Sequence, residues 1–121
     1  KKNSFDLILC NHVLEHVDDD LKVMSEFYRI LKPKGWGIFQ VPIDIKLNKT
    51  FEDSTITTPK EREKFFGQSD HVRQYGLDFG IRLKSVGFKV TEDNFIDELS
   101  ADSVKRYALP PGELIYFCEK I

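Results

Sequence analysis

Three polar or reactive side chains stand where a short apolar run ends. Cys10, Asn11 and His12 close and follow the run Phe5-Asp6-Leu7-Ile8-Leu9. In open α/β sheets ligands sit outside the carboxyl ends of the strands, so these three residues form a candidate binding edge. An imidazole titrates near neutrality, which suits His12 to proton transfer. The alternatives are that Asn11 only terminates the strand through a nearby backbone group, and that His12 has a capping or packing role.

His12, Glu15 and His16 spell the pattern His-x-x-Glu-His. Zinc peptidases of the inverted type use this pattern, with two His ligands on one helix and a Glu that activates water. That chemistry needs a long helix around both His residues and a third ligand from a distant Glu. The favoured interpretation is a hydrogen-bonded pair of Glu15 and His16 that fixes the loop, so the sequence predicts no metal site.

A second group of chemically capable residues comes later in the chain. His71, Arg73 and Tyr75 precede an expected helix and would face a substrate if their segment folds over the strand ends. Arg73 is then a candidate clamp for an acidic substrate. The alternative, slightly favoured, is a salt bridge from Arg73 to Asp70 or Asp78.

Composition limits the class of protein. The 121 residues are 40% hydrophobic and 31% charged, with a formal net charge of -2, which fits one soluble domain. No basic stripe or apolar span indicates a nucleic-acid or membrane partner, so we expect a cytoplasmic protein. Cys10 and Cys118 are expected to be buried free thiols. Because the sequence begins with Lys1 rather than Met and enters an expected strand within five residues, we expect it to be a piece of a longer gene product.

The pattern of apolar residues predicts the elements that position these side chains. Phe5 to Asn11 lacks alternation, which is typical of a strand buried on both faces and central in a parallel sheet. Asp18 to Asp20 begin an amphipathic helix that ends at the turn Lys32-Pro33-Lys34-Gly35. The run Trp36 to Val41 predicts a second strand with Trp36 in the core, stopped by Pro42 and parallel to the first.

The remaining elements complete an α/β order. Residues 43–74 are expected to form an insertion over the strand ends with a short helix from Lys60 to Phe66. A helix with Leu77, Ile81, Leu83 and Val86 is expected to close at Gly87. Strands are expected at Phe88 to Thr91 and Leu114 to Lys120, with a short helix between Asp93 and Pro111. The chain is expected to be one domain, 1–121.

Three motifs in this order resemble a known family. Phe5-Asp6-Leu7-Ile8 leading into Asn11-His12-Val13-Leu14-Glu15-His16-Val17 is similar to the fourth-strand motif of class I S-adenosylmethionine-dependent methyltransferases, particularly the small-molecule branch. Leu31-Lys32-Pro33-Lys34-Gly35-Trp36 resembles their turn into the fifth strand, and Val86-Gly87-Phe88-Lys89-Val90 resembles their entry into the sixth. The segment Phe66 to Gly76 is similar to an insertion loop of some bacterial members.

The resemblance implies the carboxyl-terminal half of a Rossmann-like methyltransferase fold. About four strands would stand in the spatial order four, five, seven, six, with the last one antiparallel. It implies that Cys10, Asn11 and His12 face S-adenosyl-L-methionine, that His12 and His71 are catalytic candidates, and that His16, Arg73 and Tyr75 contact a small-molecule substrate. The glycine-rich turn and the acidic residue that grip the cofactor would lie outside this chain, so we expect it to be inactive alone.

A different class of function is a non-catalytic self-association fragment. In the half fold that the resemblance implies, Phe5 to Asn11 would be an apolar strand with an unpaired edge, and such edges recruit another chain. We therefore expect a homodimer in which two of these strands pair or exchange.

Overall fold

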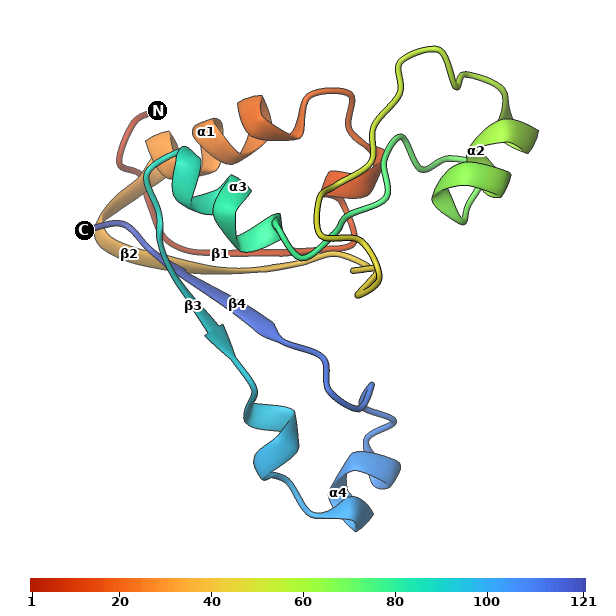
Figure 1. Ribbon diagram of the computed structural model, residues 1–121. Coiled ribbons are helices and arrows are strands. Elements are labelled where there is room, and N and C mark those ends of the chain that lie inside the picture. The colour runs from red at the N-terminus through yellow and green to blue at the C-terminus, as the bar shows by residue number, and fades with distance from the viewer.

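The computed structural model describes residues 1–121 and has a single mixed sheet with helices on one face (Figure 1). The strands are β1 (Phe5–Asn11), β2 (Leu31–Gln40), β3 (Lys89–Asp93) and β4 (Ile115–Glu119), in the spatial order β1-β2-β4-β3. β1 and β2 are parallel, whereas β4 runs antiparallel to both β2 and β3. The α/β class, the four strands, their order and the antiparallel last strand are confirmed.

Helix α1 (Asp20–Ile30) crosses from β1 to β2. Asp19 is its N-cap, because the carboxylate accepts a hydrogen bond of 2.9 Å from the backbone N–H of Lys22. The expected turn at Lys32 to Gly35 is instead an irregularity within β2, where the register with β1 shifts and Lys34 has a φ of 67°. The expectation that these residues separate the helix from the strand was therefore wrong, since β2 begins at Leu31.

The other helices are short. They are α2 (Pro59–Phe66), α3 (Phe79–Ser85) and α4 (Ala101–Arg106), with 3-10 turns η1 (Leu14–His16) and η2 (Phe95–Glu98). A reciprocal capping box between Thr58 and Glu61 starts α2, and Gly67 ends it with a φ of 90°. Gly87 follows α3 with a φ of 113°, a conformation that favours glycine.

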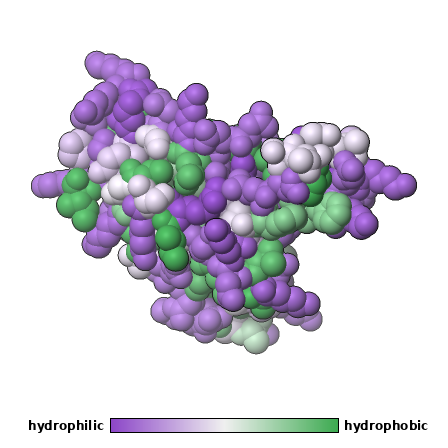
Figure 2. Space-filling model, turned by 45° about the horizontal axis from the view of Figure 1, so that its top comes forward, coloured by the Kyte–Doolittle hydropathy of each residue, from purple (hydrophilic) through white to green (hydrophobic).

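The core lies between the sheet and the helices α1 and α3 (Figure 1). Twelve buried hydrophobic residues from the strands, the helices and the segments between them form it: Cys10, Leu14, Met24, Leu31, Phe39, Val41, Tyr75, Phe79, Leu83, Phe88, Tyr116 and Cys118. The side of the molecule turned forward in Figure 2 is mostly hydrophilic, with smaller hydrophobic areas between the polar side chains.

The opposite face of the sheet is not covered by helices (Figure 1). Phe5, Leu7 and Leu9 alternate along β1 and are exposed, and Trp36 on β2 stands opposite Leu7 and is also exposed. The expectations that β1 is buried on both faces and central, and that Trp36 belongs to the core, were therefore wrong. β1 is an edge strand with one apolar face open to solvent.

Residues 43–74 lie beyond the carboxyl ends of β1 and β2 (Figure 1). Isolated bridges attach both ends of this segment, Ile43 to Tyr75 and Phe51 to Gln74. That residues 43–74 are an insertion stays a prediction. No helix in the structure is both long enough and apolar enough to span a bilayer.

Candidate functional site

The carboxyl end of β1 presents one buried and two exposed side chains. Cys10 is buried, and burial together with the negative charge of Glu15 raises the pKa of its thiol to about 11, so it is a poor nucleophile near neutral pH. Asn11 is exposed. His12 is 59% exposed in its side chain and has a φ of 54°, while its backbone N–H donates to the carbonyl of Gln40 at 2.9 Å. A left-handed non-glycine residue at a strand end is a strained position of the kind found at binding sites.

The turn η1 places Glu15 and His16 next to this edge. The side chain of Glu15 is only 2% exposed, and its Oε1 lies 3.3 Å from His12 Nδ1 and 3.8 Å from His16 Nε2. Neither carboxylate oxygen has a hydrogen-bond partner. The expected hydrogen-bonded pair of Glu15 and His16 was therefore wrong, because 3.8 Å is too long for such a bond.

The same geometry removes the support for the peptidase alternative. η1 has three residues, and His12 lies before it in a left-handed backbone conformation. The two His residues of the pattern therefore do not share the helix that the inverted zinc-peptidase arrangement requires.

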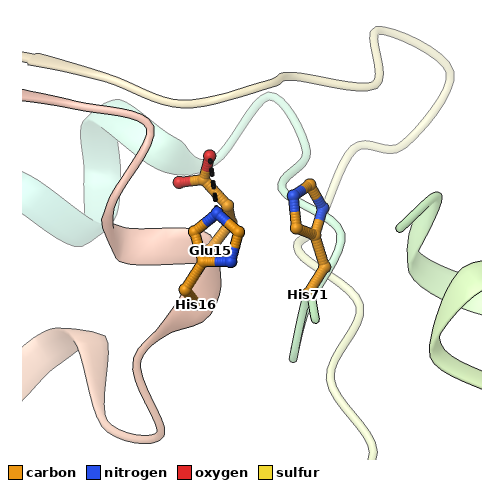
Figure 3. A group of neighbouring side chains, drawn as sticks. All are labelled: Glu15, His16 and His71. Atoms are coloured by element: carbon orange, nitrogen blue, oxygen red, sulfur yellow. Dashed lines mark ion pairs between the residues drawn. The ribbon is translucent and has the colours of Figure 1, made fainter. Parts of the chain in front are cut away.

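The segment before α3 brings His71 to this turn. His71 is buried, and its ring lies edge-to-face against that of His16 with centroids 4.8 Å apart. Its Nδ1 is 3.2 Å from the carbonyl oxygen of Phe66. The structure thus joins His16 and His71, which are far apart in the sequence, as Figure 3 shows.

Arg73 ties this segment to η1. Its guanidinium donates to the carbonyl oxygens of Leu14, Val17 and Asp18 at 2.5, 2.6 and 2.9 Å, and to Glu52 Oε1 at 2.6 Å. The expected salt bridge to Asp70 or Asp78 was wrong: Asp70 Oδ2 lies 3.3 Å from His16 Nδ1, and Asp78 accepts from Thr50. The guanidinium of Arg73 thus already donates to four protein acceptors, and its contact with a substrate stays a prediction.

A buried ionic group behind this segment was not expected from the sequence. The carboxylate of Asp20 accepts from Tyr75 Oη at 2.7 Å and from Arg82 Nε and Nη2 at 3.0 and 2.6 Å, with Arg73 Nε 4.0 Å away. Burial alone would raise the pKa of Asp20, but the bonds from Arg82 and Tyr75 and the nearby charges hold it below its usual value.

Tyr75 is buried within this group, and burial and its bond to Asp20 raise the pKa of its phenol. A contact of Tyr75 with a substrate stays a prediction. One sequence signal pointed to Asp20, the run of three Asp residues, but helix capping explained that run equally well. Nothing in the sequence connected Asp20 with Arg82.

Two clefts lie near the site. One, of about 350 Å³, has charged walls that include Asp18, Glu52, Arg62 and Arg73. The other, of about 230 Å³, has mainly apolar walls that include Ile43, which follows β2, and Leu114, which precedes β4. Gln40, at the end of β2, bonds the carbonyl of Leu114 at 2.9 Å, so the apolar cleft adjoins the same carboxyl edge of the sheet.

The comparisons with known proteins identify the fold. Residues 1–39 match a family model described as a methyltransferase domain. A crystal structure of 1,6-didemethyltoxoflavin-N1-methyltransferase from Burkholderia thailandensis, with bound 1,6-didemethyltoxoflavin and S-adenosylhomocysteine, is 14% identical, with a TM-score of 0.62 over 99% of this chain and 45% of that one. The fold of this chain is part of a Rossmann-like methyltransferase fold. The resemblance found in the sequence motifs is thereby confirmed.

Two further proteins are similar to this chain. An S-adenosylmethionine-dependent methyltransferase from Mesorhizobium loti is 16% identical, with a TM-score of 0.57 over 98% of this chain and 63% of that one. An uncharacterised protein of Methanocaldococcus jannaschii is 60% identical over 97 residues, which are 79% of this chain and 36% of that protein. The chain therefore spans about a third of the curated relative that it matches.

The residues at the carboxyl edge of β1 fit one end of the methyl donor that this fold implies. Asn11 and His12 are exposed polar groups beside a strand end, where small polar ligand groups bind in α/β sheets. Three glycines have a positive φ: Gly67 and Gly87, which come after α2 and α3, and Gly112, which lies in the turn before β4. None of them lies directly after the end of β1. The contacts of Cys10, Asn11 and His12 with the donor stay predictions.

Proposed function

We propose that this chain is the substrate-facing half of an S-adenosylmethionine-dependent methyltransferase that acts on a small molecule. The observation that carries the proposal is the carboxyl edge of the sheet, where Asn11 and His12 are exposed. Gln40, the partner of Asn11 on β2, bonds the carbonyl of Leu114, which lines the apolar cleft of about 230 Å³. An apolar cleft beside a few polar groups is the usual form of a small-molecule site. A cytoplasmic location belongs to this proposal.

In the proposed reaction the residues of this chain align the two reactants and remove a proton from the acceptor. When bound, the donor supplies an electrophilic methyl group on a sulfonium sulfur. Asn11 holds the polar end of the donor, and the apolar cleft orients the acceptor so that its nucleophilic atom faces the methyl carbon. The donor's sulfur would keep the electron pair of the broken bond as a neutral thioether, and the proposed role of His12 is to take the proton that the acceptor loses. Alignment of the reactants supplies most of the rate in such a transfer.

The other predicted site residues have more enclosed positions. His71 and Tyr75 are buried, whereas His16 is one-third exposed and Arg73 lines the charged cleft. We propose that His16 and Arg73 approach the substrate from that side, with Arg73 also fixing the backbone of η1. His71 stays a candidate catalytic residue, and Tyr75 a candidate substrate contact, each of which requires an opening of its segment.

The test uses a donor with a deuterated methyl group and an untargeted search for labelled products. This chain and its Methanocaldococcus jannaschii relative are each incubated with the donor and a metabolite extract, and the small-molecule and macromolecular fractions are analysed separately by mass spectrometry. We expect label in the small-molecule fraction with the relative and none with the chain alone. Label only in protein or nucleic acid, or no label with either protein, would refute the proposal.

A second function, self-association, is favoured by the open edge and face of β1. One side of β1 pairs with β2 and the other has no neighbouring strand, while Leu9 is 63% exposed on the uncovered face. We propose that two copies of the chain pair through Phe5 to Asn11 as a homodimer.

A further inference from the structure

The side chains of Glu15, His16 and His71 converge on one point beside η1 (Figure 3). One potential ligand atom from each, a carboxylate oxygen and two ring nitrogens, lies within 4.8 Å of the others. Two imidazoles and one carboxylate are a common ligand set for zinc and other divalent first-row transition metals. The two His residues come from separate segments, so this arrangement differs from the sequence pattern formed by His12, Glu15 and His16.

The carboxylate of Glu15 is the observation that points to a ligand. The side chain is 2% exposed, and neither oxygen has a hydrogen-bond partner, although His12 Nδ1 and His16 Nε2 lie 3.3 and 3.8 Å from Oε1. Buried carboxylates are costly unless they are paired, hydrogen-bonded or bound to a metal. A bound cation at this point would compensate the charge that the protein leaves without a hydrogen bond.

Both imidazoles are oriented as metal ligands are. His71 Nδ1 lies 3.2 Å from the carbonyl oxygen of Phe66, and His16 Nδ1 lies 3.3 Å from the carbonyl oxygen and from Oδ2 of Asp70. A ring that donates through Nδ1–H to a carbonyl or carboxylate leaves the lone pair of Nε2 free. His16 Nε2 is the ring nitrogen on the side of Glu15.

The two segments that carry these side chains are joined by the backbone. The N–H of Val72 donates to the carbonyl of Glu15 at 2.9 Å, and Arg73 donates to the carbonyls of Leu14 and Val17. The residues on each side of the cluster are therefore held in register before any ligand arrives. Such prior positioning is what a metal site needs for affinity.

We propose that Glu15, His16 and His71 bind a divalent transition-metal ion, with Zn²⁺ as the ion that the ligand set fits best. Three protein ligands leave one position of a tetrahedral ion for water or another ligand. Asp70 and the carbonyl of Phe66 are the positioning groups for the two rings. The proposal does not depend on methyl transfer and assigns this chain a second binding site at the edge of the first.

Calorimetric titration of the chelator-treated chain with Zn²⁺ tests the proposal. We expect one ion per chain, and a loss of affinity of about 100-fold or more in E15Q and in H71Q, since even outer-shell partners of such sites are worth 10- to 100-fold. E63Q, which neutralises an exposed carboxylate on the nearby α2, should bind as the unchanged protein does. Absence of saturable binding, or equal affinity in E15Q and E63Q, would overturn the proposal.

Two further measurements separate loss of the site from loss of the fold. E15Q removes a buried charge that makes no hydrogen bond, so the metal-free variant should unfold at a higher temperature than the metal-free unchanged protein. Added Zn²⁺ should raise the unfolding temperature of the unchanged protein but not that of E15Q. In the unchanged protein, the ring ¹⁵N resonances of the three His residues can be followed by NMR during the titration. His16 and His71 should shift at Nε2 and keep their Nδ1–H; shifts confined to His12 would also overturn the proposal.

Discussion

Replacing Asp20 with asparagine should destabilise the protein strongly, because Asp20 joins α1 to the segment that carries His71. Its carboxylate binds Tyr75 at 2.7 Å and Arg82 through two bonds of 3.0 and 2.6 Å, and its side chain is 3% exposed. Asparagine keeps one acceptor oxygen but removes the charge. Breaking a buried ion pair costs about 3–5 kcal/mol, and Arg82 keeps some solvent contact, so we expect a loss of about 3 kcal/mol.

Urea unfolding at neutral pH measures this change. With a slope of about 1.5 kcal/mol per molar, a loss of about 3 kcal/mol lowers the midpoint by about 2 M. The matched control is D19N, because asparagine caps a helix as well as aspartate does and should change stability by less than about 0.5 kcal/mol. If D20N costs less than about 1 kcal/mol, or no more than D19N, the argument that the Asp20 group holds the two segments together is refuted.

The pH dependence of stability gives a second measurement on the same variant. The pKa of Asp20 is lowered in the folded protein, since its bonds to Arg82 and Tyr75 outweigh the effect of burial. Its contribution is therefore fully present above the unfolded pKa of about 3.9 and is lost as the pH falls through the lower folded value. D20N should lose less stability than the unchanged protein over that acid range, and an equal loss would contradict the assignment.

Two more predictions concern β1 and the cysteines. L9K places a charge on the exposed face of β1, so it should turn the proposed homodimer into a monomer in light scattering. L77K, at another exposed leucine, should leave the homodimer intact. If the unchanged protein is a monomer at high concentration, the homodimer proposal is refuted. Burial raises the pKa of Cys10 to about 11, aided by Glu15, and that of Cys118 to about 12. Iodoacetamide at pH 8 should therefore leave both thiols unmodified in the folded protein and alkylate both in urea, and fast native labelling would show that the thiols are accessible.

Local patterns were sufficient to predict most of the fold. The apolar run of β1, the capping residues before α1 and α2 and the glycine after α3 each act through neighbouring residues, so the sequence displays them directly. The central position expected for β1 failed because an unbroken apolar run does not distinguish a strand covered on both faces from one whose second face is open. Trp36 was misassigned for the same reason.

The contacts of the site were less predictable, because they join segments that are distant in the sequence. The pattern of His12, Glu15 and His16 drew attention to one turn, but the second ring beside His16 comes from His71. The partners of Arg73 are mainly backbone carbonyls, which carry no side-chain signal. The sequence indicated only a role for Asp20 at the start of a helix, because Tyr75 and Arg82 come close to it only in the folded chain.

An NMR titration of this chain with S-adenosylhomocysteine tests the central claim, that the carboxyl edge of β1 is part of a methyl-donor site. Backbone amide shifts report contacts even when binding is weak, so a partial site is sufficient for the measurement. We expect saturable shifts centred on Cys10, Asn11 and His12, weakened in N11A, with the amides of α4 unchanged. Shifts centred elsewhere, or none at the highest attainable ligand concentration, would contradict it.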